Sequence, residues 1–278
     1  MKKKIYLAID NHFDAMWRRC NDRPLRFNGE SYVSYSDLQA YYIEDNLKLA
    51  QSYPDYKFQI ETVHTAEMFL ESHPDCREAF FQALQRGQLL VSGSGYLIID
   101  SNMVRGESLV RNYLQGFLWM KENGHPLPRL AVRNDAFGNC AQLPQILLGC
   151  GFEWLKDTSY VRNSGKFWRG LDGSVIGTDW PDAVGGGGGW AKYAPCPACH
   201  GEKTIDGVPC KHCGGRGIDI QKAEKRRAPL TLPEKISEDF GIAAAGGEEF
   251  LPIAETVEIA RRLQSRFDIR FAFEQKIA

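Results

Sequence analysis

The chain has 278 residues, of which 43% are hydrophobic and 25% charged, a composition that can bury a core and argues against disorder. The formal net charge of −1 gives no general attraction to nucleic acid, and the mixed basic run at residues 222–227 indicates a solvated surface. No apolar stretch is long enough to cross a membrane, and the one after the N-terminal lysines is too short for a signal peptide. We therefore expect a cytoplasmic protein that binds neither nucleic acid nor membranes.

Short apolar runs alternate with helical patterns up to residue 178, which is typical of an α/β fold with a parallel sheet or barrel. Strands are predicted at residues 4–10, 57–61, 89–92, 129–133, 152–156 and 174–178. Helices are predicted at residues 35–53, 66–70, 75–86, 106–123 and 141–150. Gly87 and Gly151 follow the third and fifth of these helices, where glycine commonly ends a helix.

The pattern breaks after residue 178, where five consecutive glycines at 185–189 disfavour regular structure. A cysteine-rich segment follows, and the alternation then resumes. Helices are predicted at residues 232–239 and 253–267, and strands at 242–245 and 269–273. We interpret residues 194–218 as an insertion in one loop of a domain that spans residues 1–278.

Polar residues at two predicted strand ends are candidates for chemistry. His12 and Asp14 follow the first strand and, being two residues apart on an extended segment, point to the same side. An imidazole and a carboxylate at the C-terminal end of a barrel strand are a common zinc pair, although ordinary polar groups at a strand end also give this pattern. Asp135 follows the strand at 129–133 and either caps the next helix or presents its carboxylate to the barrel mouth.

An ordered set of motifs resembles the family 38 α-mannosidases of the glycoside hydrolases. His12, Asp14 and Trp17 match an H-x-D-x-x-W motif, and residues 135–147 match a D-x-F-G stretch followed by P-x-I-L. The segments FQIE at 58–61, GESLVR at 106–111, FWRGLDGS at 167–174 and GGEEF at 246–250 continue the match in the family's order. The resemblance covers nearly the whole chain outside the cysteine-rich segment.

The resemblance implies a parallel (β/α)7-type barrel of the glycoside hydrolase and deacetylase kind, acting on α-mannosides or mannose-containing oligosaccharides. His12, Asp14 and Asp135 would be ligands of a catalytic zinc, and Asp135 would also be the nucleophile of a retaining mechanism. Glu249, with Glu248 beside it, would be the acid/base, although the family has aspartate there. Trp17 would stack on a mannose ring.

The family's fourth zinc ligand and its helical and C-terminal β-domains have no counterpart in these 278 residues. We therefore expect the chain by itself to bind metal but to hydrolyse mannosides slowly, and we expect complementing domains or a second copy as possible partners.

A second metal signal is the spacing C-x2-C-x10-C-x2-C, formed by Cys196, Cys199, Cys210 and Cys213. Two such pairs place four thiolates around one zinc and resemble the knuckles of DnaJ-type chaperones. Four thiolates leave no open position, so the sequence predicts one structural zinc besides the catalytic one. Disulfides are the alternative, which a cytoplasmic setting disfavours.

Two other functions remain open. A zinc-dependent carbohydrate deacetylase has a related barrel but normally carries an H-x-x-x-H pair, which this sequence lacks. A non-catalytic zinc-ribbon module that binds protein or nucleic acid fits the cysteines, although not the near-neutral charge or the extent of the barrel motifs. Metal content together with hydrolysis of aryl α-mannosides separates the three functions.

Overall fold

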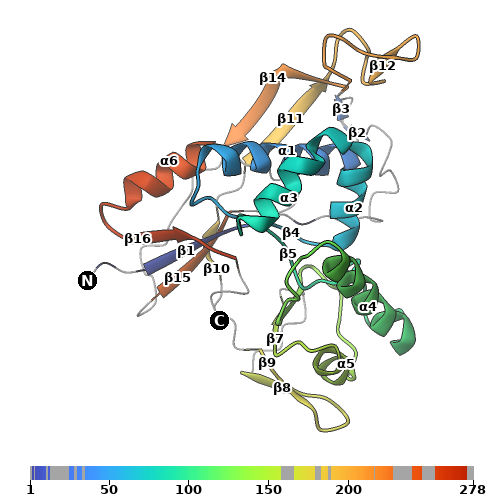
Figure 1. The fold of residues 1–278 in the computed structure, drawn as a ribbon, viewed down its shortest axis with the longest axis vertical. Helices are drawn as coiled ribbons and strands as arrows, with labels where there is room; N and C mark the ends of the chain where they lie inside the picture. Colours follow the sequence, from blue (N-terminus) through green and yellow to red (C-terminus); the bar gives the residue numbers. More distant parts are fainter. Residues whose placement is uncertain are drawn as a thin grey trace.

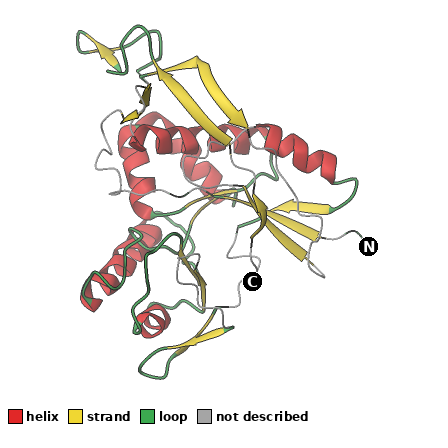
Figure 2. Cartoon of the chain, turned by 180° about the vertical axis from the view of Figure 1, so that it is seen from behind, coloured by secondary structure: helices red, strands yellow, loops and turns green. Residues whose placement is uncertain are grey.

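The chain forms an α/β fold, shown as a ribbon in Figure 1 and from behind in Figure 2. This computed structural model describes residues 2, 4–10, 12, 25–27, 30–32, 35–157, 166–178, 183–186, 189–215, 217–227, 240–245 and 254–273. The helices are α1 (Tyr35–Ser52), α2 (Val63–Ser72), α3 (Arg77–Gln85), α4 (Gly106–Glu122), α5 (Leu143–Gly149) and α6 (Ala254–Leu263), with the 3-10 turn η1 (Pro74–Cys76) before α3.

Most of the described strands that alternate with helices run parallel, as the sequence predicts. They are β1 (Lys4–Ile9), β4 (Phe58–Ile60), β5 (Leu89–Val91), β6 (Leu130–Arg133), β7 (Trp154–Asp157), β9 (Val175–Gly177), β10 (Ala183–Gly186), β15 (Phe240–Ala245) and β16 (Asp268–Phe271). The antiparallel strands are β2 (Leu25–Phe27), β3 (Glu30–Tyr32), β8 (Phe167–Arg169), β11 (Gly189–Pro195), β12 (Thr204–Ile205), β13 (Val208–Pro209) and β14 (Ile218–Arg227).

The parallel strands form three separate groups within the described part of the chain. The strand orders are β10-β15-β1-β16, β4-β5 and β6-β7-β9, with β8 added antiparallel to β9. The closed (β/α)7 barrel expected from the sequence is therefore not seen among these residues as one hydrogen-bonded ring, because the ladders stop between the groups. The β4-β5 group and the β6-β7-β9 group still contact each other, because Val132 N of β6 donates to Gly93 O, just after β5, at 3.3 Å. The fold class is α/β, and barrel closure stays a prediction.

Gly93 explains how β5 and β6 come so close. A Cβ at this position would lie 1.9 Å from the carbonyl oxygen of Leu130. Only glycine permits two backbones to approach this closely. Gly93, two residues after the end of β5, therefore lies directly against the start of β6.

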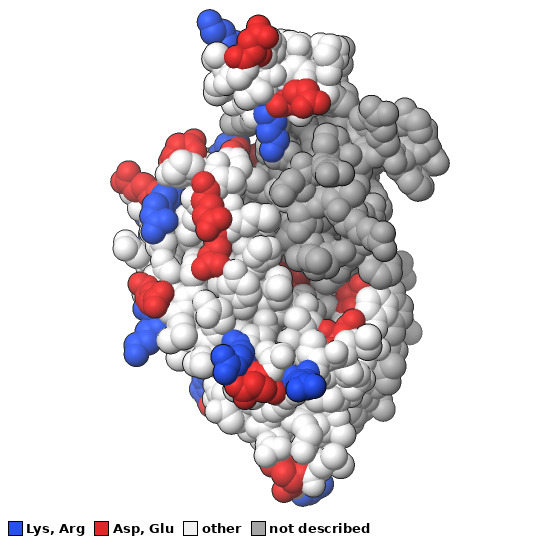
Figure 3. Space-filling model, turned by 90° about the vertical axis from the view of Figure 1, so that its right-hand side faces the viewer, with Lys and Arg blue, Asp and Glu red and all other residues white. Residues whose placement is uncertain are grey.

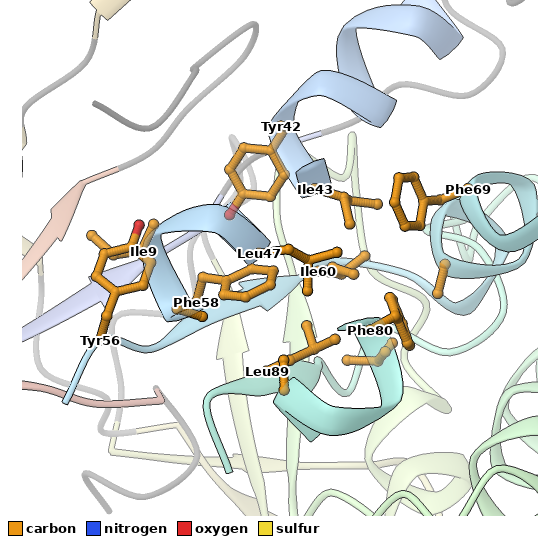
Figure 4. Close-up of a cluster of buried hydrophobic side chains, with 14 of the residues drawn as sticks. Ile9, Tyr42, Ile43, Leu47, Tyr56, Phe58, Ile60, Phe69, Phe80 and Leu89 are labelled. Atoms are coloured by element: carbon orange, nitrogen blue, oxygen red, sulfur yellow. The ribbon is translucent and has the colours of Figure 1, made fainter. Parts of the chain in front are cut away.

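The largest core lies between the first two parallel groups and the helices that cover them (Figure 4). Tyr42 and Leu47 of α1 and Phe69 of α2 are among the side chains packed over Phe58 and Ile60 of β4. Apolar residues recur on the inner helix faces, and the β4 strand is buried throughout, which is typical of a parallel sheet covered by helices. This packing fixes the C-terminal ends of β1 and β4 near one another.

The five-glycine segment differs from its prediction. Gly185 and Gly186 end β10, and Gly189 begins β11. β10 obtains its hydrogen-bonding partner from β15 and β11 from β14, so tertiary pairing overrides the poor intrinsic preference of glycine. The helix predicted at residues 232–239 lies outside the described residues.

Two surface properties bear on partners. None of the helices in the described part of the chain is long and apolar enough to cross a membrane. On the face seen in Figure 3, acidic and basic side chains are interspersed over the described surface. The cytoplasmic location expected from the sequence stays a prediction.

Candidate active site and cysteine cluster

The C-terminal ends of β1, β4 and β6 bring polar side chains from distant parts of the chain together. Asp10 and His12 follow β1, Glu61 follows β4, and Asn134 and Asp135 follow β6. These five residues are called the polar cluster. Parallel α/β folds commonly carry their ligand sites at this end of the strands. The predicted residues His12 and Asp135 thus lie close to one another, and their role as metal ligands stays a prediction.

The imidazole of His12 lies between two carboxylates. Its Nδ1 is 3.0 Å from both carboxylate oxygens of Glu61, and its Nε2 is 3.7 Å from Oδ2 of Asp135. Asn134 Nδ2 donates to Glu61 Oε1 at 2.8 Å and reaches Asp10 Oδ2 at 3.5 Å. Glu61 is 1% exposed, whereas the Asp135 side chain is 31% exposed, so Asp135 forms the open side of the cluster.

The donor set fits a zinc ion. Tetrahedral zinc with nitrogen and oxygen ligands keeps neighbouring ligand atoms about 3.4 Å apart, close to the 3.7 Å between His12 Nε2 and Asp135 Oδ2. The carboxylates of Glu61 and Asp135 flank the imidazole and Asp10 reaches the neighbouring Asn134, and the buried negative charge of Asp10 and Glu61 favours a cation. Burial, followed by the charge of Asp10, raises the pKa of the neighbouring Tyr42.

Asp135 does not cap a helix. The next helix, α5, begins at Leu143, and its N-cap residue is Gln142, seven positions after Asp135. Asp135 has a φ of +51°, a left-handed conformation that costs most side chains free energy and that aspartate tolerates better than most. The sequence left two interpretations of Asp135 open. The structure excludes the helix cap and places the Asp135 carboxylate at the end of strand β6.

Arg133 fixes the loop that carries Asp135. This arginine is 2% exposed, and its guanidinium donates to Asn139 Oδ1 at 2.7 Å and to Ile99 O at 2.9 Å. Asn139 in turn donates to Asp157 Oδ2 at 2.6 Å, which ties the loop to the end of β7. A buried guanidinium bonded in this way holds the loop in one conformation.

Several predicted site residues cannot be placed. Asp14, Trp17, Glu248 and Glu249 lie outside the described residues, so their roles stay predictions. The structure adds Asp10, Glu61 and Asn134, which the sequence did not mark as site residues. Glu61 ends the FQIE segment at a strand end, and a buried charged residue in that position is the signal that could have identified it.

Comparison with known proteins decides the family. The description "Glycosyl hydrolases family 38 N-terminal domain" matches residues 3–180, which include β1, β4, β6 and the polar cluster. The chain belongs to glycosyl hydrolase family 38. Alpha-mannosidase G of Dictyostelium discoideum is 30% identical over 139 residues, which is 47% of this chain and 13% of that protein. Human Alpha-mannosidase 2C1 is 30% identical over 144 residues, 49% of this chain and 14% of that protein. The match thus spans about a seventh of these relatives' length.

Two solved structures share the fold of this chain. The crystal structure of an alpha-mannosidase from Enterococcus faecalis superposes with a TM-score of 0.62 at 19% identity, covering 98% of this chain and 28% of that one. A 4-alpha-glucanotransferase from Thermococcus litoralis gives a TM-score of 0.52 at 13% identity, covering 99% of this chain and 38% of the other. At these identities the likeness concerns the fold.

The cysteine cluster lies beyond the residues that the family 38 description matches. Cys196, Cys199, Cys210 and Cys213 are all buried, and their sulfur atoms lie within 4.8 Å of one another. The Cys196–Cys210 and Cys199–Cys213 sulfur pairs are 3.9 and 3.7 Å apart. These separations exceed a disulfide bond of about 2.05 Å and match the edge of about 3.8 Å expected for four sulfurs around tetrahedral zinc.

Each cysteine pair is followed by a turn with the same backbone conformation. His200 and Gly214, each directly after the second cysteine of its pair, have φ values of +52° and +62°. The next residues, Gly201 and Gly215, also have positive φ, at +93° and +78°. Gly217 N donates to Cys213 Sγ at 3.2 Å, as expected where backbone amides support a thiolate. The two halves of the cluster therefore repeat one local structure.

Electrostatics in the cluster favours a bound cation. Burial raises the pKa of Cys199 to about 11, whereas the backbone hydrogen bond from Cys213 lowers the pKa of Cys210 to about 7. Four thiolates do not coexist at this distance without a positive charge between them, and a metal that binds them releases their protons.

The cysteine cluster stands apart from the polar cluster. β11 and β14 form an antiparallel arm that carries the cysteine segment and the small β12–β13 hairpin away from the rest of the chain (Figure 1). The arm spans residues 189–227, longer than the insertion of residues 194–218 predicted from the sequence.

Proposed function

We propose that this family 38 chain carries the catalytic domain of a zinc-dependent retaining α-mannosidase. The observation that carries the proposal is the approach of His12 Nε2 to Asp135 Oδ2 at 3.7 Å, at the ends of two parallel strands inside the family match. Asp14, two residues after His12, would complete a three-ligand set. The relatives named α-mannosidases support mannose-containing oligosaccharides as substrates.

The protein's residues would act as follows. Zinc bound to His12, Asp14 and Asp135 would supply a Lewis acid for sugar hydroxyl groups. The free carboxylate oxygen of Asp135 attacks C1 of the mannoside, the C1–O bond breaks, and Glu249 gives its proton to the leaving oxygen. Glu249 then takes a proton from water, which attacks C1 and releases Asp135. Glu248 is the alternative acid/base, and Trp17 would stack on the sugar.

The proposal includes a second, structural zinc held by the four cysteines. Their sulfur separations and repeated turns support it, and four thiolates leave no position for substrate. Closure of a (β/α)7-type barrel around the polar cluster belongs to the same proposal, supported by the parallel strands and by the contact between β5 and β6.

Hydrolysis of aryl α-mannosides by the zinc-saturated chain tests the proposed function. The assay needs long incubation, so that slow turnover is detected. We expect hydrolysis that depends on zinc and falls by at least about 1,000-fold in Asp135→Asn, since an amide cannot act as the nucleophile. Asp172→Asn is the matched control, because Asp172 lies exposed in the turn between β8 and β9 and bonds only locally to Ser174 among the contacts described.

Two results would overturn the proposal. Mannoside hydrolysis that survives in Asp135→Asn would remove Asp135 from the nucleophile role. Release of acetate from acetylated sugars, with no mannoside hydrolysis, would assign the polar cluster to a deacetylase instead.

A further inference from the structure

Glu61 is the most buried charged group of the polar cluster and contacts its imidazole directly. It is 1% exposed, and each of its carboxylate oxygens lies 3.0 Å from His12 Nδ1. A carboxylate accepts hydrogen bonds and donates none. The contact therefore requires a proton on His12 Nδ1, which leaves Nε2, 3.7 Å from Asp135 Oδ2, as the ring nitrogen that can bind a metal.

The backbone around Glu61 is fixed on both sides. Its carbonyl oxygen accepts a hydrogen bond from Ser92 Oγ at 2.7 Å, from the segment that follows β5. The next residue, Thr62, is the N-cap of α2, and its Oγ1 accepts a hydrogen bond from Thr65 N at 3.3 Å. Glu61 thus stands on a rigid strand-to-helix junction that holds its carboxylate in place.

Asn134 connects the same carboxylate to the strand that carries Asp135. Its Nδ2 donates to Glu61 Oε1 at 2.8 Å, and the residue directly precedes Asp135 at the end of β6. One carboxylate group therefore orients the side chain of His12 and anchors the start of the Asp135 loop.

We propose that Glu61 is a positioning residue that fixes the tautomer and the ring orientation of His12, so that Nε2 and Asp135 face one metal ion. The inference rests on the proposed function, because it assigns the metal to His12. Carboxylate groups behind metal-bound histidines act in this way, and their loss typically weakens metal binding by about 10- to 100-fold.

Glu61→Gln is the informative substitution, because glutamine has nearly the same shape. Its amide oxygen would accept from Asn134 Nδ2, as Glu61 Oε1 does, which turns its NH2 group toward His12 and favours the tautomer with the proton on Nε2 and Nδ1 as acceptor. That tautomer removes the lone pair that would face the metal. Glu61→Asp keeps the carboxylate one methylene shorter and should recover part of the effect.

The first measurement is made without metal at the polar cluster. Nitrogen-15 NMR of the histidine side chains in the 278-residue chain reports the tautomer of His12. We expect Nδ1 to carry a proton in the parent chain and to lose it, in favour of Nε2–H, in Glu61→Gln. An unchanged His12 signal in Glu61→Gln would overturn the inference, whatever the metal result.

The second measurement is titration with Co²⁺ after the cysteine cluster has been filled with zinc. We expect the dissociation constant for Co²⁺ to rise about 10- to 100-fold in Glu61→Gln and less in Glu61→Asp. Glu44→Gln is the matched control, since Glu44 is also a buried carboxylate beside a histidine, with Oε1 3.7 Å from His73 Nε2.

The outcomes separate the inference from the proposed function. Metal affinity in Glu61→Gln within about threefold of the parent overturns the inference and leaves the mannosidase proposal standing. Failure of the parent chain to bind Co²⁺ at the polar cluster counts against the catalytic metal, and the NMR result then decides the role of Glu61. Circular dichroism of each variant shows whether the fold is retained, and Glu61→Asp supplies the test if Glu61→Gln unfolds.

Discussion

The polar cluster and the cysteine cluster differ in how far apart in the chain their residues lie. Asn134 and Asp10 of the polar cluster are 124 residues apart, whereas Cys196 and Cys210 are 14 residues apart. The polar cluster depends on the packing of β1, β4 and β6, and the cysteine cluster depends on two short turns. The first is therefore as stable as the domain, whereas the proposed zinc would be what holds the second together.

The difference also separates their chemistry. Nitrogen and oxygen donors with a 31% exposed Asp135 side chain leave the polar cluster open to a substrate. Four buried sulfurs would occupy every position around a tetrahedral metal in the cysteine cluster and leave none for a substrate. An open site and a closed site in one chain predict that each can be damaged without the other.

The largest expected effect follows Cys213→Ser. Losing one of four thiolates should remove about one zinc per chain, because structural zinc sites of this type contribute on the order of 10 kcal/mol of binding free energy. Metal counting by mass spectrometry and hydrogen exchange should show loss of zinc and loss of protection at residues 196–217. The polar cluster should keep its metal.

Cys150→Ser is the control for this change. Cys150 is a half-buried free cysteine outside the cluster, so its replacement should leave the zinc content unchanged. A Cys213→Ser protein that retains both its zinc content and the protection of residues 196–217 would contradict the structural role.

A smaller effect is expected from Gly93→Ala, which acts on the other region. The added Cβ would lie 1.9 Å from Leu130 O, so β6 must move, and we expect the free energy of unfolding to fall by about 3 kcal/mol. Urea unfolding measures the loss, and the zinc of the cysteine cluster should be unaffected.

Gly106→Ala is the matched glycine control. Gly106 begins α4, and a Cβ there meets nothing within 4 Å. We expect a change within about 0.5 kcal/mol, in the stabilising direction if alanine improves the helix. Equal losses for the two alanine variants would show that the close approach of β5 and β6 does not support the fold.

The sequence predicts the local features best. Most helices and parallel strands appear within a few residues of their predicted bounds, because apolar periodicity and helix-ending glycines are local signals. The cysteine spacing likewise predicts the cluster that the structure contains. Several strands are absent from the prediction, among them β10, β11 and β14, because glycines and a charged run are typical of loops or surfaces until a partner strand supplies the hydrogen bonds.

The polar cluster was predicted only in part. His12 and Asp135 were named from motifs, and the structure places them together. Glu61 and Asn134 were missed, because their role arises only when the ends of β4 and β6 converge on His12. A charged residue at the end of the FQIE strand marks Glu61 as a candidate, but no local pattern in the sequence encodes the convergence of the strand ends.

Covalent labelling of Asp135 tests the central claim most directly. An activated mannosyl fluoride with a second fluorine on the ring forms a glycosyl-enzyme that hydrolyses slowly, so a retaining nucleophile becomes labelled. We predict one sugar per zinc-loaded chain, on the peptide that contains Asp135, and no labelling of Asp135→Asn. A label on another carboxylate, or none on a chain that hydrolyses aryl α-mannosides, would contradict the account.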